Sequence, residues 1–492
     1  MRKIQNAIIS VYNKDKIDLI ANELKALGVE IFSTGGTYDY LHKIGINAVA
    51  VEQLTGYPSI FGGRVKTLHP TVMGGILYRR ENEDDVKEAK KYKIPPIDLV
   101  IVDLYPFEET LAKTTVEAEI IEKIDIGGIS LIRGAAKNFA DVICVPSRDY
   151  YQKFLDLLKS GKGVTTLEDR KRFARHCFEV SSSYDRLIAD YFAGSMPLRY
   201  GENPHQKAIY HGDIKECFEQ LHGKEISYNN LLDIDAAVAL IADFETPTFA
   251  IIKHNNACGV ATRPTLLASW KDALAGDPVS AFGGVLVCNE IVDKKTAEEV
   301  NKLFFEILIA PDFKADALEI LKSKKNRILL KQKEFALPAK QHRSLLLGTI
   351  EQERDISIEN TDTLTYPTVA RPSVKQMDDL FYANLLVKHT KSNAIVLVKN
   401  CQLLASGMGQ TSRVDALKHA IEKAKQFNMN LSGAVLASDA FFPFKDCVEI
   451  AAKEGITAII QPGGSIRDQE SVEACDNAGI AMVFTGIRHF KH

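Results

Sequence analysis

The chain has 492 residues, a formal net charge of −3 and 46% hydrophobic residues. This length predicts a globular protein of two or more domains, and the near-neutral charge argues against a nucleic-acid-binding protein, which usually has a basic excess. No apolar run is long enough for a membrane-spanning helix, and the first residues resemble a strand rather than a secretory signal. The eight cysteines include no CxxC pair, which predicts reduced thiols in a cytoplasmic protein with neither a disulfide framework nor a zinc site.

The first third of the chain alternates short apolar runs with amphipathic helical patterns. The apolar runs predict strands at residues 4–11, 29–32, 46–51, 97–104 and 141–145. Strands that alternate with helices indicate an α/β fold with a parallel, doubly wound sheet. Ligands of such sheets bind at the carboxyl ends of the strands. The polar loops that follow these strands are therefore the first candidates for a functional site.

One such loop, Ser33-Thr34-Gly35-Gly36-Thr37, lies between a predicted strand and a helix. Two glycines allow a tight turn that exposes consecutive N–H groups, and the hydroxyls and the positive end of the helix complete an anion site, most often for phosphate. The loop matches neither GxGxxG nor GxxxxGK[ST], so neither a dinucleotide nor an ATP-type P-loop is indicated. A simple capped turn explains the loop equally well.

Three further polar stretches are expected at the same edge of the sheet. They are GGRVKTLHP at residues 62–70, DLYPF at 103–107 and DIGG at 125–128, the last preceding a helix that carries Lys137. Taken singly, each has a bland explanation, since the cations could be solvated and Asp125 could be a helix cap. Together they supply an anion cradle, two amines, a phenol and a carboxylate. That combination favours a phosphorylated small molecule that undergoes proton transfer over a scaffold.

A domain boundary is expected just before the proline- and glycine-containing stretch at 194–205, which divides the chain into residues 1–194 and 195–492. A plain linker is the alternative explanation of this stretch. Beyond it, a weak repeat of strand, helix and polar turn predicts two related α/β halves, approximately 195–325 and 375–492. The region Lys322 to Ser373 is more polar and is predicted to connect them.

The basic pair Lys253-His254 ends the first strand of this repeat. Such a pair is often only a surface feature, but a neighbouring ammonium also favours the neutral, basic form of an imidazole. No HxE with PCxxC accompanies the pair, so zinc-deaminase chemistry is not supported. Residues 407–413, GMGQTSR, form a second turn of glycines and hydroxyls before a helix, either another phosphate cradle or a capped turn.

The ordered motifs of the whole chain resemble those of one family. They are STGGT, GGRVKTLHP, DLYPF, DIGG, LRYGENPHQ, KHNN, SAFGG, KSNA, GQTSR, SDAFFPF, PGGS and TGIRHF. In this order they are similar to the bifunctional purine-biosynthesis proteins that join a phosphoribosyl-aminoimidazole-carboxamide (AICAR) formyltransferase to an inosine monophosphate (IMP) cyclohydrolase. The resemblance implies a methylglyoxal-synthase-like N-terminal domain and two cytidine-deaminase-like C-terminal halves without the metal.

The resemblance also implies an activity. Residues 195–492 would transfer a formyl group from the co-substrate 10-formyltetrahydrofolate to AICAR, giving FAICAR, and residues 1–194 would close the second ring to IMP with loss of water. No tightly bound cofactor or metal, no nucleic acid and no membrane partner are expected. A cytoplasmic homodimer is implied, with transformylase sites shared between subunits.

The same resemblance assigns roles to particular residues. For ring closure the expected catalytic residues are Lys66, Lys137, Tyr105 and Asp125. Nucleotide contacts in that domain are expected from Ser10, Lys14, Ser33, Thr34, Gly35, Gly36, Thr37, Arg64, Thr67, Asp103, Gly127 and Gly128. For formyl transfer, His254 beside Lys253 is the expected base. The expected nucleotide contacts there are Arg199, Tyr200, Gly283, Glu306, Asn393 and Arg413, and the expected folate contacts are Asp439, Gly463, Gly464 and Arg488.

The chain departs from the family pattern at a few positions. Tyr12 and Asn13 stand where Ser and Asp are common, Asp103 where Asn is usual, Ala257 where Pro is frequent, and Glu306 where some relatives have Asp. None of these changes removes a proposed catalytic group. Two other functions remain as alternatives: a phosphosugar lyase of the methylglyoxal-synthase kind, and a non-catalytic nucleotide or folate sensor.

Overall fold

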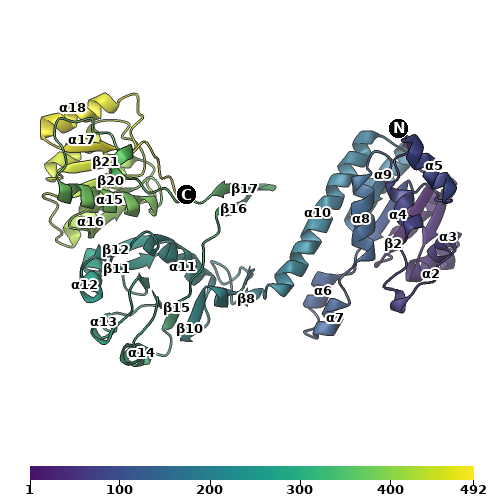
Figure 1. Cartoon of the computed structure of the whole chain (residues 1–492), viewed down its shortest axis with the longest axis horizontal. Coiled ribbons are helices and arrows are strands. Elements are labelled where there is room, and N and C mark those ends of the chain that lie inside the picture. The colour runs from purple at the N-terminus through teal and green to yellow at the C-terminus, as the bar shows by residue number, and fades with distance from the viewer. The chain divides into compact units, whose positions relative to one another are not determined.

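The structure, a computed structural model, covers residues 1–492 and divides into two compact units, Met1–Ser195 and Met196–His492 (Figure 1). No helix in it combines the length and the apolar character needed to cross a membrane. All eight cysteines are unpaired.

The first unit is built on a five-stranded sheet in which every neighbouring pair of strands is parallel. In spatial order its strands are β4 (Ala48–Ala50), β3 (Glu30–Ser33), β2 (Asn6–Val11), β5 (Leu99–Asp103) and β6 (Ile143–Val145). A small antiparallel pair, β1 (Arg2–Lys3) and β7 (Val164–Thr165), lies outside this sheet. The prediction of a parallel α/β sheet is confirmed.

Helices cover both faces of this sheet, because alternate strand residues point to opposite sides and both sets are apolar. The helices are α1 (Ile17–Ala26), α2 (Gly35–Lys43), α3 (Val51–Thr55), α4 (Pro70–Leu77), α5 (Glu83–Lys91), α6 (Phe107–Leu111), α7 (Glu117–Ile121), α8 (Gly127–Lys137), α9 (Tyr151–Ser160) and α10 (Leu167–Phe192). One core joins α1, α2 and α9 to Ile9 and Ile101, and the other joins α4 and α8 to Ile8 and Val100. The long helix α10 contributes to both cores.

One predicted element differs from the structure. The apolar run 46–51 contains a strand of only three residues, because Val51 already begins α3 and is fully buried against the opposite face of the sheet. The GGRVKTLHP loop therefore follows a helix and not a strand. It still reaches the carboxyl edge of the sheet, where Thr67 is buried.

The second unit contains two sheets with the same strand pattern. In the first, β11 (Thr248–Lys253) pairs antiparallel with β12 (Asn256–Thr262) and with β13 (Val285–Cys288), and the parallel strands β14 (Ile307–Ala310) and β15 (Ile328–Gln332) follow. In the second sheet the corresponding strands are β18 (Ile395–Val398), β19 (Leu403–Gly407), β20 (Val435–Ser438), β21 (Ala458–Gln461) and β22 (Ala481–Phe484). Strand β10 (Phe218–His222) extends the first sheet beyond β15.

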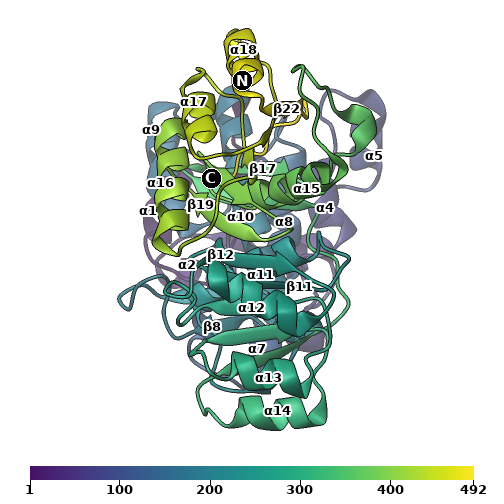
Figure 2. The ribbon, with the colours of Figure 1, turned by 90° about the vertical axis from the view of Figure 1, so that its left-hand side faces the viewer.

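A single large core lies between these two sheets and includes α11 (Tyr228–Ile241) and α15 (Val374–Lys388). Two smaller cores lie on the other faces. The helices there are α12 (Leu266–Gly276), α13 (Lys294–Val300) and α14 (Ala315–Lys322) for the first sheet, and α16 (Arg413–Gln426), α17 (Asp446–Lys453) and α18 (Asp468–Ala478) for the second. Strands β12 and β19 lie next to each other (Figure 2), and Ala261 of β12 forms an isolated antiparallel bridge with Gln402, which directly precedes β19. The two halves thus form one body.

The segment between the halves is shorter than its composition suggests. Strand β15 lies within the region predicted as a connection, yet it pairs with β14, so the first half extends to Gln332. The lysines at 322, 324 and 325 make this region polar on average, so the short apolar run 328–330 is not predicted as a strand. The remaining segment carries an exposed hairpin of β16 (Lys340–Leu345) and β17 (Gly348–Glu353). A second small hairpin, β8 (Met196–Leu198) with β9 (Ala208–Tyr210), begins this unit.

Candidate active sites

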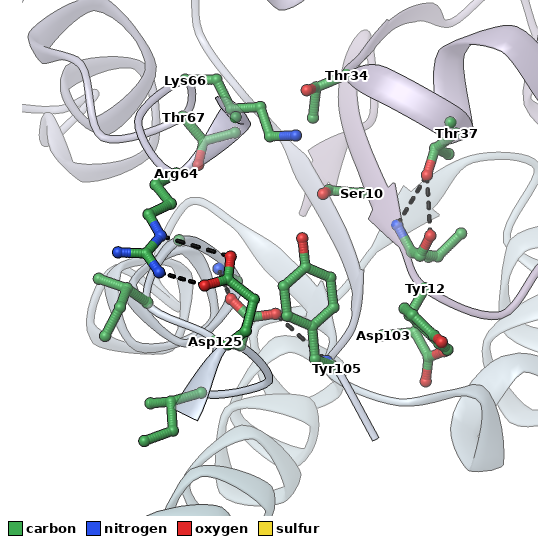
Figure 3. A pocket seen from close by; sticks show the side chains of 18 of the residues that line it. Ser10, Tyr12, Thr34, Thr37, Arg64, Lys66, Thr67, Asp103, Tyr105 and Asp125 are labelled. Carbon is green, nitrogen blue, oxygen red and sulfur yellow. Dashed lines mark hydrogen bonds and ion pairs between the residues drawn. The ribbon is translucent and has the colours of Figure 1, made fainter. Parts of the chain in front are cut away.

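The first unit contains a cavity of ≈ 650 Å³ at the carboxyl edge of its sheet (Figure 3). The ends of β2 and β5 form its floor, and the N-termini of α2 and α8 and the loop before α4 form its walls. Thirteen of the sequence-predicted residues line it: Ser10, Lys14, Thr34, Gly36, Thr37, Arg64, Lys66, Thr67, Asp103, Tyr105, Asp125, Gly127 and Gly128. The tertiary structure therefore brings together stretches that are distant in the sequence.

One end of this cavity is suited to an anion. Thr34 precedes the first turn of α2, and its hydroxyl is buried without a hydrogen-bond partner. The Lys66 ammonium lies 3.4 Å from the position that a Cβ on Gly35 would occupy, and its side chain reaches toward Thr34 and Ser10 (Figure 3). An unpaired hydroxyl, an ammonium and the free N–H groups of a helix N-terminus are the groups that bind phosphate.

The opposite side of the cavity carries a phenol and a carboxylate. The Asp125 carboxylate accepts the backbone N–H of Gly128 at 2.6 Å and that of Tyr105 at 3.4 Å. Burial raises the pKa of Asp125, and nearby Lys66 opposes this rise. Burial also raises the pKa of Tyr105, with a smaller contribution from Asp125. Asp125 thus caps α8 and also faces the cavity, so the two explanations of this residue are compatible.

Several other predicted contacts are already engaged within the protein. The Ser33 hydroxyl is fully buried and donates to the Ile9 carbonyl at 2.8 Å, so it joins β3 to β2 and does not line the cavity. The Lys14 ammonium donates to the backbone carbonyl of Val11 and to Thr37 Oγ1. Burial lowers the pKa of Lys14, and Asp103 offsets part of this effect. Lys14 is therefore tied to the loop as well as being close to the cavity.

Lys137 has a different position from the other predicted catalytic residues. It is the last residue of α8 and is exposed, whereas the first residues of that helix line the cavity. Eleven residues of helix correspond to about 15 Å along the axis. Its role in ring closure stays a prediction from the resemblance.

Glu122, which lines the cavity, and Lys123, which packs on two of the rings that line it, are not singled out by the sequence. Lys123 lies 5.5 Å from the ring centroid of Tyr12 and 5.6 Å from that of Tyr105, and the two rings meet edge to face. Nearby, Arg64 forms an exposed ion pair with Glu122. The large side chain of Tyr12 thus forms part of the wall of the cavity. No motif in the sequence around Glu122 and Lys123 indicates that these two residues lie near it.

In the second unit, Lys253 and His254 lie at a cavity of ≈ 280 Å³ that both halves line. His254 is exposed at the tip of the β11–β12 hairpin. The Lys253 ammonium donates to the Phe282 carbonyl, and a Cβ on Gly283 would lie 3.4 Å from it. The second half contributes Ala405, Ser406, Met408 and Lys423 to the lining.

A buried polar network lies close to the start of α16. Arg413 donates to Asn393 Oδ1 at 2.9 Å, to Ser438 Oγ at 2.8 Å and to Asp439 Oδ1 at 2.5 Å. Asp439 is fully buried, and its second oxygen has no partner. Arg413 and Asp439 therefore stabilise each other and leave one acceptor free.

The remaining residues predicted for this unit do not line the smaller cavity. The Arg199 guanidinium packs over the ring of Tyr200, and Glu306 pairs with Lys224 at 2.7 Å. Arg488 stacks over Phe490. The Gly463–Gly464 turn follows β21, where both glycines have positive φ and a Cβ on Gly463 would lie 2.9 Å from the ring of Phe484.

The C-terminal segment that carries Arg488 is anchored by a buried histidine. His489 bonds Asp355 and Glu359 at 2.7 Å each through its two ring nitrogens, and its backbone N–H donates to the Asp439 carbonyl. Burial of the ring opposes its charge, but hydrogen bonds to the two carboxylates outweigh this and raise the pKa of His489 to about 9. The segment is thus held by a charged imidazole at neutral pH.

This geometry predicts a pH-dependent stability. Because His489 binds its proton more tightly in the folded chain than in the unfolded one, its contribution is complete below about pH 6.5 and is lost as the pH rises through about 9. The contribution is at most about 3 kcal/mol. We expect the difference in thermal midpoint between wild type and His489→Gln, measured for the second unit, to become smaller as the pH rises from 6.5 to 9.5. Parallel curves over this range would contradict the assignment.

Comparison with known proteins agrees with this architecture. Residues 16–130 match the family model of the MGS-like domain, and residues 135–423 match that of the AICARFT/IMPCHase bienzyme. The Bifunctional purine biosynthesis protein PurH of Bacteroides thetaiotaomicron is 59% identical over 503 residues, covering 100% of this chain and 99% of its own. The proteins of that name from Aquifex aeolicus and Acetivibrio thermocellus are 47% and 46% identical, each covering 99% of this chain and 100% of its own.

The fold and the two cavities define an α/β enzyme with separate candidate sites in its two units. The chain belongs to the AICARFT/IMPCHase bienzyme family. It is a bifunctional enzyme of purine biosynthesis that combines a formyltransferase with a cyclohydrolase, as the motif order predicts. The match over the full length favours this function over a phosphosugar lyase.

Proposed function

We propose that the C-terminal region, residues 195–492, transfers the formyl group of 10-formyltetrahydrofolate to the 5-amino group of AICAR, and that the N-terminal region, residues 1–194, closes the ring of FAICAR to IMP. The observation that carries this division is that one cavity of the first unit combines a candidate phosphate site, with an unpaired Thr34 hydroxyl beside Lys66, and the proton-transfer groups of Tyr105 and Asp125. The Lys253–His254 cavity lies wholly within the second unit.

For ring closure, the chemistry needs a folded-back substrate and the movement of protons. The carboxamide nitrogen attacks the formyl carbon and loses one proton while the formyl oxygen takes one up; the formamide nitrogen then loses its proton as the oxygen leaves as water and the C=N bond forms. Holding both reacting groups of one molecule together supplies a large part of the rate. Lys66 would polarise the formyl oxygen while Tyr105 and Asp125 move protons, with the phosphate bound near Thr34 and Gly36.

For formyl transfer, the aromatic amine of AICAR is a weak nucleophile because its lone pair is delocalised toward the carboxamide. A base must take its proton as the nitrogen attacks the formyl carbon, and the bond from that carbon to the folate then breaks. His254, exposed at the cavity, is the candidate base, and Lys253 lies beside it. Positioned base catalysis contributes about 10²–10⁴-fold.

The contacts that hold the two substrates are proposed from the family motifs. Arg199, Tyr200, Gly283, Glu306, Asn393 and Arg413 would bind AICAR, and Asp439, Gly463, Gly464 and Arg488 would bind the folate. The free oxygen of Asp439 supports this, since a buried unpaired acceptor is costly unless a ligand group meets it. We further propose a cytoplasmic homodimer that acts on small molecules, without a nucleic-acid or membrane partner.

One assay tests this function directly. Purified protein is mixed with AICAR and 10-formyltetrahydrofolate, and the nucleotides are separated by chromatography. IMP together with tetrahydrofolate is the expected result. FAICAR without IMP would contradict a working first unit and point to Tyr12, Asn13 and Asp103 as the cause. Tight binding of both substrates by folded protein, without any product, would favour the non-catalytic sensor.

A further inference from the structure

The candidate base His254 occupies an unusual backbone position. It and Asn255 are the two turn residues of the β11–β12 hairpin, between the paired residues Lys253 and Asn256. Both have positive φ, 50° for His254 and 64° for Asn255. Two-residue hairpins with two left-handed residues favour Asn and Gly, and a bulky residue there is strained unless its surroundings hold it. The position of His254 therefore needs a support outside the hairpin.

Asp233 on α11 provides that support. Its Oδ1 accepts the backbone N–H of Asn255 at 2.6 Å, and the backbone N–H of His254 also bonds to this carboxylate. With its amide nitrogen directed toward α11, the Asn255 side chain donates to the Leu232 carbonyl at 2.9 Å and to Asp233 Oδ1 at 3.1 Å. Neighbouring residues of α11 lie in the main core, so the carboxylate is held on a rigid element.

The second half repeats this arrangement without a histidine. Asp379 on α15 accepts the backbone N–H groups of Asn400 at 2.9 Å and Cys401 at 2.6 Å. These two residues turn the β18–β19 hairpin, again with positive φ of 54° and 49°. The same spacing of 21 residues separates Asp233 from His254 and Asp379 from Asn400. The carboxylate clamp is thus a device of the repeat, and only the first copy presents an imidazole.

We propose that Asp233 is a positioning residue for formyl transfer, whose carboxylate holds the left-handed turn that aims His254 at the amine of AICAR. This inference rests on the proposed role of His254 as the base. Asp379 performs the same backbone function where no reacting group is present. Loss of either clamp costs stability, but only the loss of Asp233 moves a group that takes part in the chemistry.

The test compares Asp233→Ala with the matched control Asp379→Ala in the full chain. We expect Asp233→Ala to lower kcat for formyl transfer by about 10- to 100-fold, because small misplacements of a catalytic group have effects of that size. KM for AICAR should change far less, and ring closure of supplied FAICAR should not change. Asp379→Ala should keep kcat within about twofold of wild type. Its thermal midpoint should fall by about as much as that of Asp233→Ala.

A second variant separates positioning from general damage to the fold. Glycine adopts positive φ without strain, so Asn255→Gly in the Asp233→Ala background should restore much of kcat. Asp233→Asn keeps one acceptor, so its kcat for formyl transfer should lie between those of wild type and Asp233→Ala. This variant replaces Asp233→Ala in the test if the alanine variant does not fold. Equal kcat losses in Asp233→Ala and Asp379→Ala, or no rescue by glycine, would overturn the inference. Unchanged formyl transfer in His254→Ala would instead overturn the proposed base, and the inference with it.

Discussion

His254→Ala is expected to lower the rate of formyl transfer by about 10²–10⁴-fold, the usual contribution of a positioned base. The imidazole is exposed at the cavity and anchors no other side chain, so its removal should leave the fold intact. Ring closure of supplied FAICAR should continue at the wild-type rate, because that cavity lies in the other unit. Formation of tetrahydrofolate and of IMP, measured separately, gives the two rates.

The chain contains a matched control for this substitution. Asn400 occupies the corresponding first position of the second hairpin and has nearly the same backbone conformation, with φ of 54° against 50°. Asn400→Ala therefore disturbs the same kind of turn without removing a candidate base, and both rates should stay close to wild type. If His254→Ala abolished both activities in a well-folded protein, the assignment of two separate sites would be wrong.

Lys66→Ala is expected to impair ring closure and to leave formyl transfer intact, the reverse of the pattern expected for His254→Ala. The Lys66 ammonium is the cation placed next to the Gly35 turn and the unpaired Thr34 hydroxyl, and its charge opposes part of the rise that burial causes in the pKa of Asp125. Its removal should weaken phosphate binding and leave the developing charge on the formyl oxygen without a partner. A loss of about 10²–10³-fold in ring closure is expected from the loss of such a group.

The measurement follows the nucleotides over time when AICAR and 10-formyltetrahydrofolate are supplied. FAICAR should accumulate in Lys66→Ala, while tetrahydrofolate forms at the wild-type rate. Lys43→Ala removes an exposed lysine from the end of α2 and should change neither rate. Wild-type IMP production by Lys66→Ala would show that this ammonium takes no part in closing the ring.

Much of this architecture is readable from local patterns. Alternating apolar runs predict the parallel sheet, because strands buried on both faces need nearly continuous apolar sequence. The loop from Ser33 to Thr37 and the DIGG stretch indicate helix N-termini, because glycines and capping groups act within a few residues. The repeat of strand and polar turn predicts two related halves, because each of these signals also lies within a short stretch of sequence. The family follows from the order of a dozen motifs along the chain.

Other features depend on contacts between distant segments. From the sequence, Ser33, Thr34 and Thr37 are all predicted as nucleotide contacts. The fold shows that the Ser33 hydroxyl is bonded to the Ile9 carbonyl, whereas the Thr34 hydroxyl has no partner. Lys137 shares a helix with cavity residues, yet the length of that helix carries it away from them. Local spacing cannot separate these cases, because hydrogen-bond partners are decided by which strands become neighbours.

By itself the sequence determined the class of fold, the family and the groups able to do the chemistry, since these depend on residue type and short-range pattern. The tertiary structure decided which groups face a cavity, which are consumed by internal hydrogen bonds, and that Asp233 supports His254 across 21 residues. The physical reason is that burial and hydrogen bonding are properties of packed neighbours, and packing joins parts of the chain that no local pattern relates.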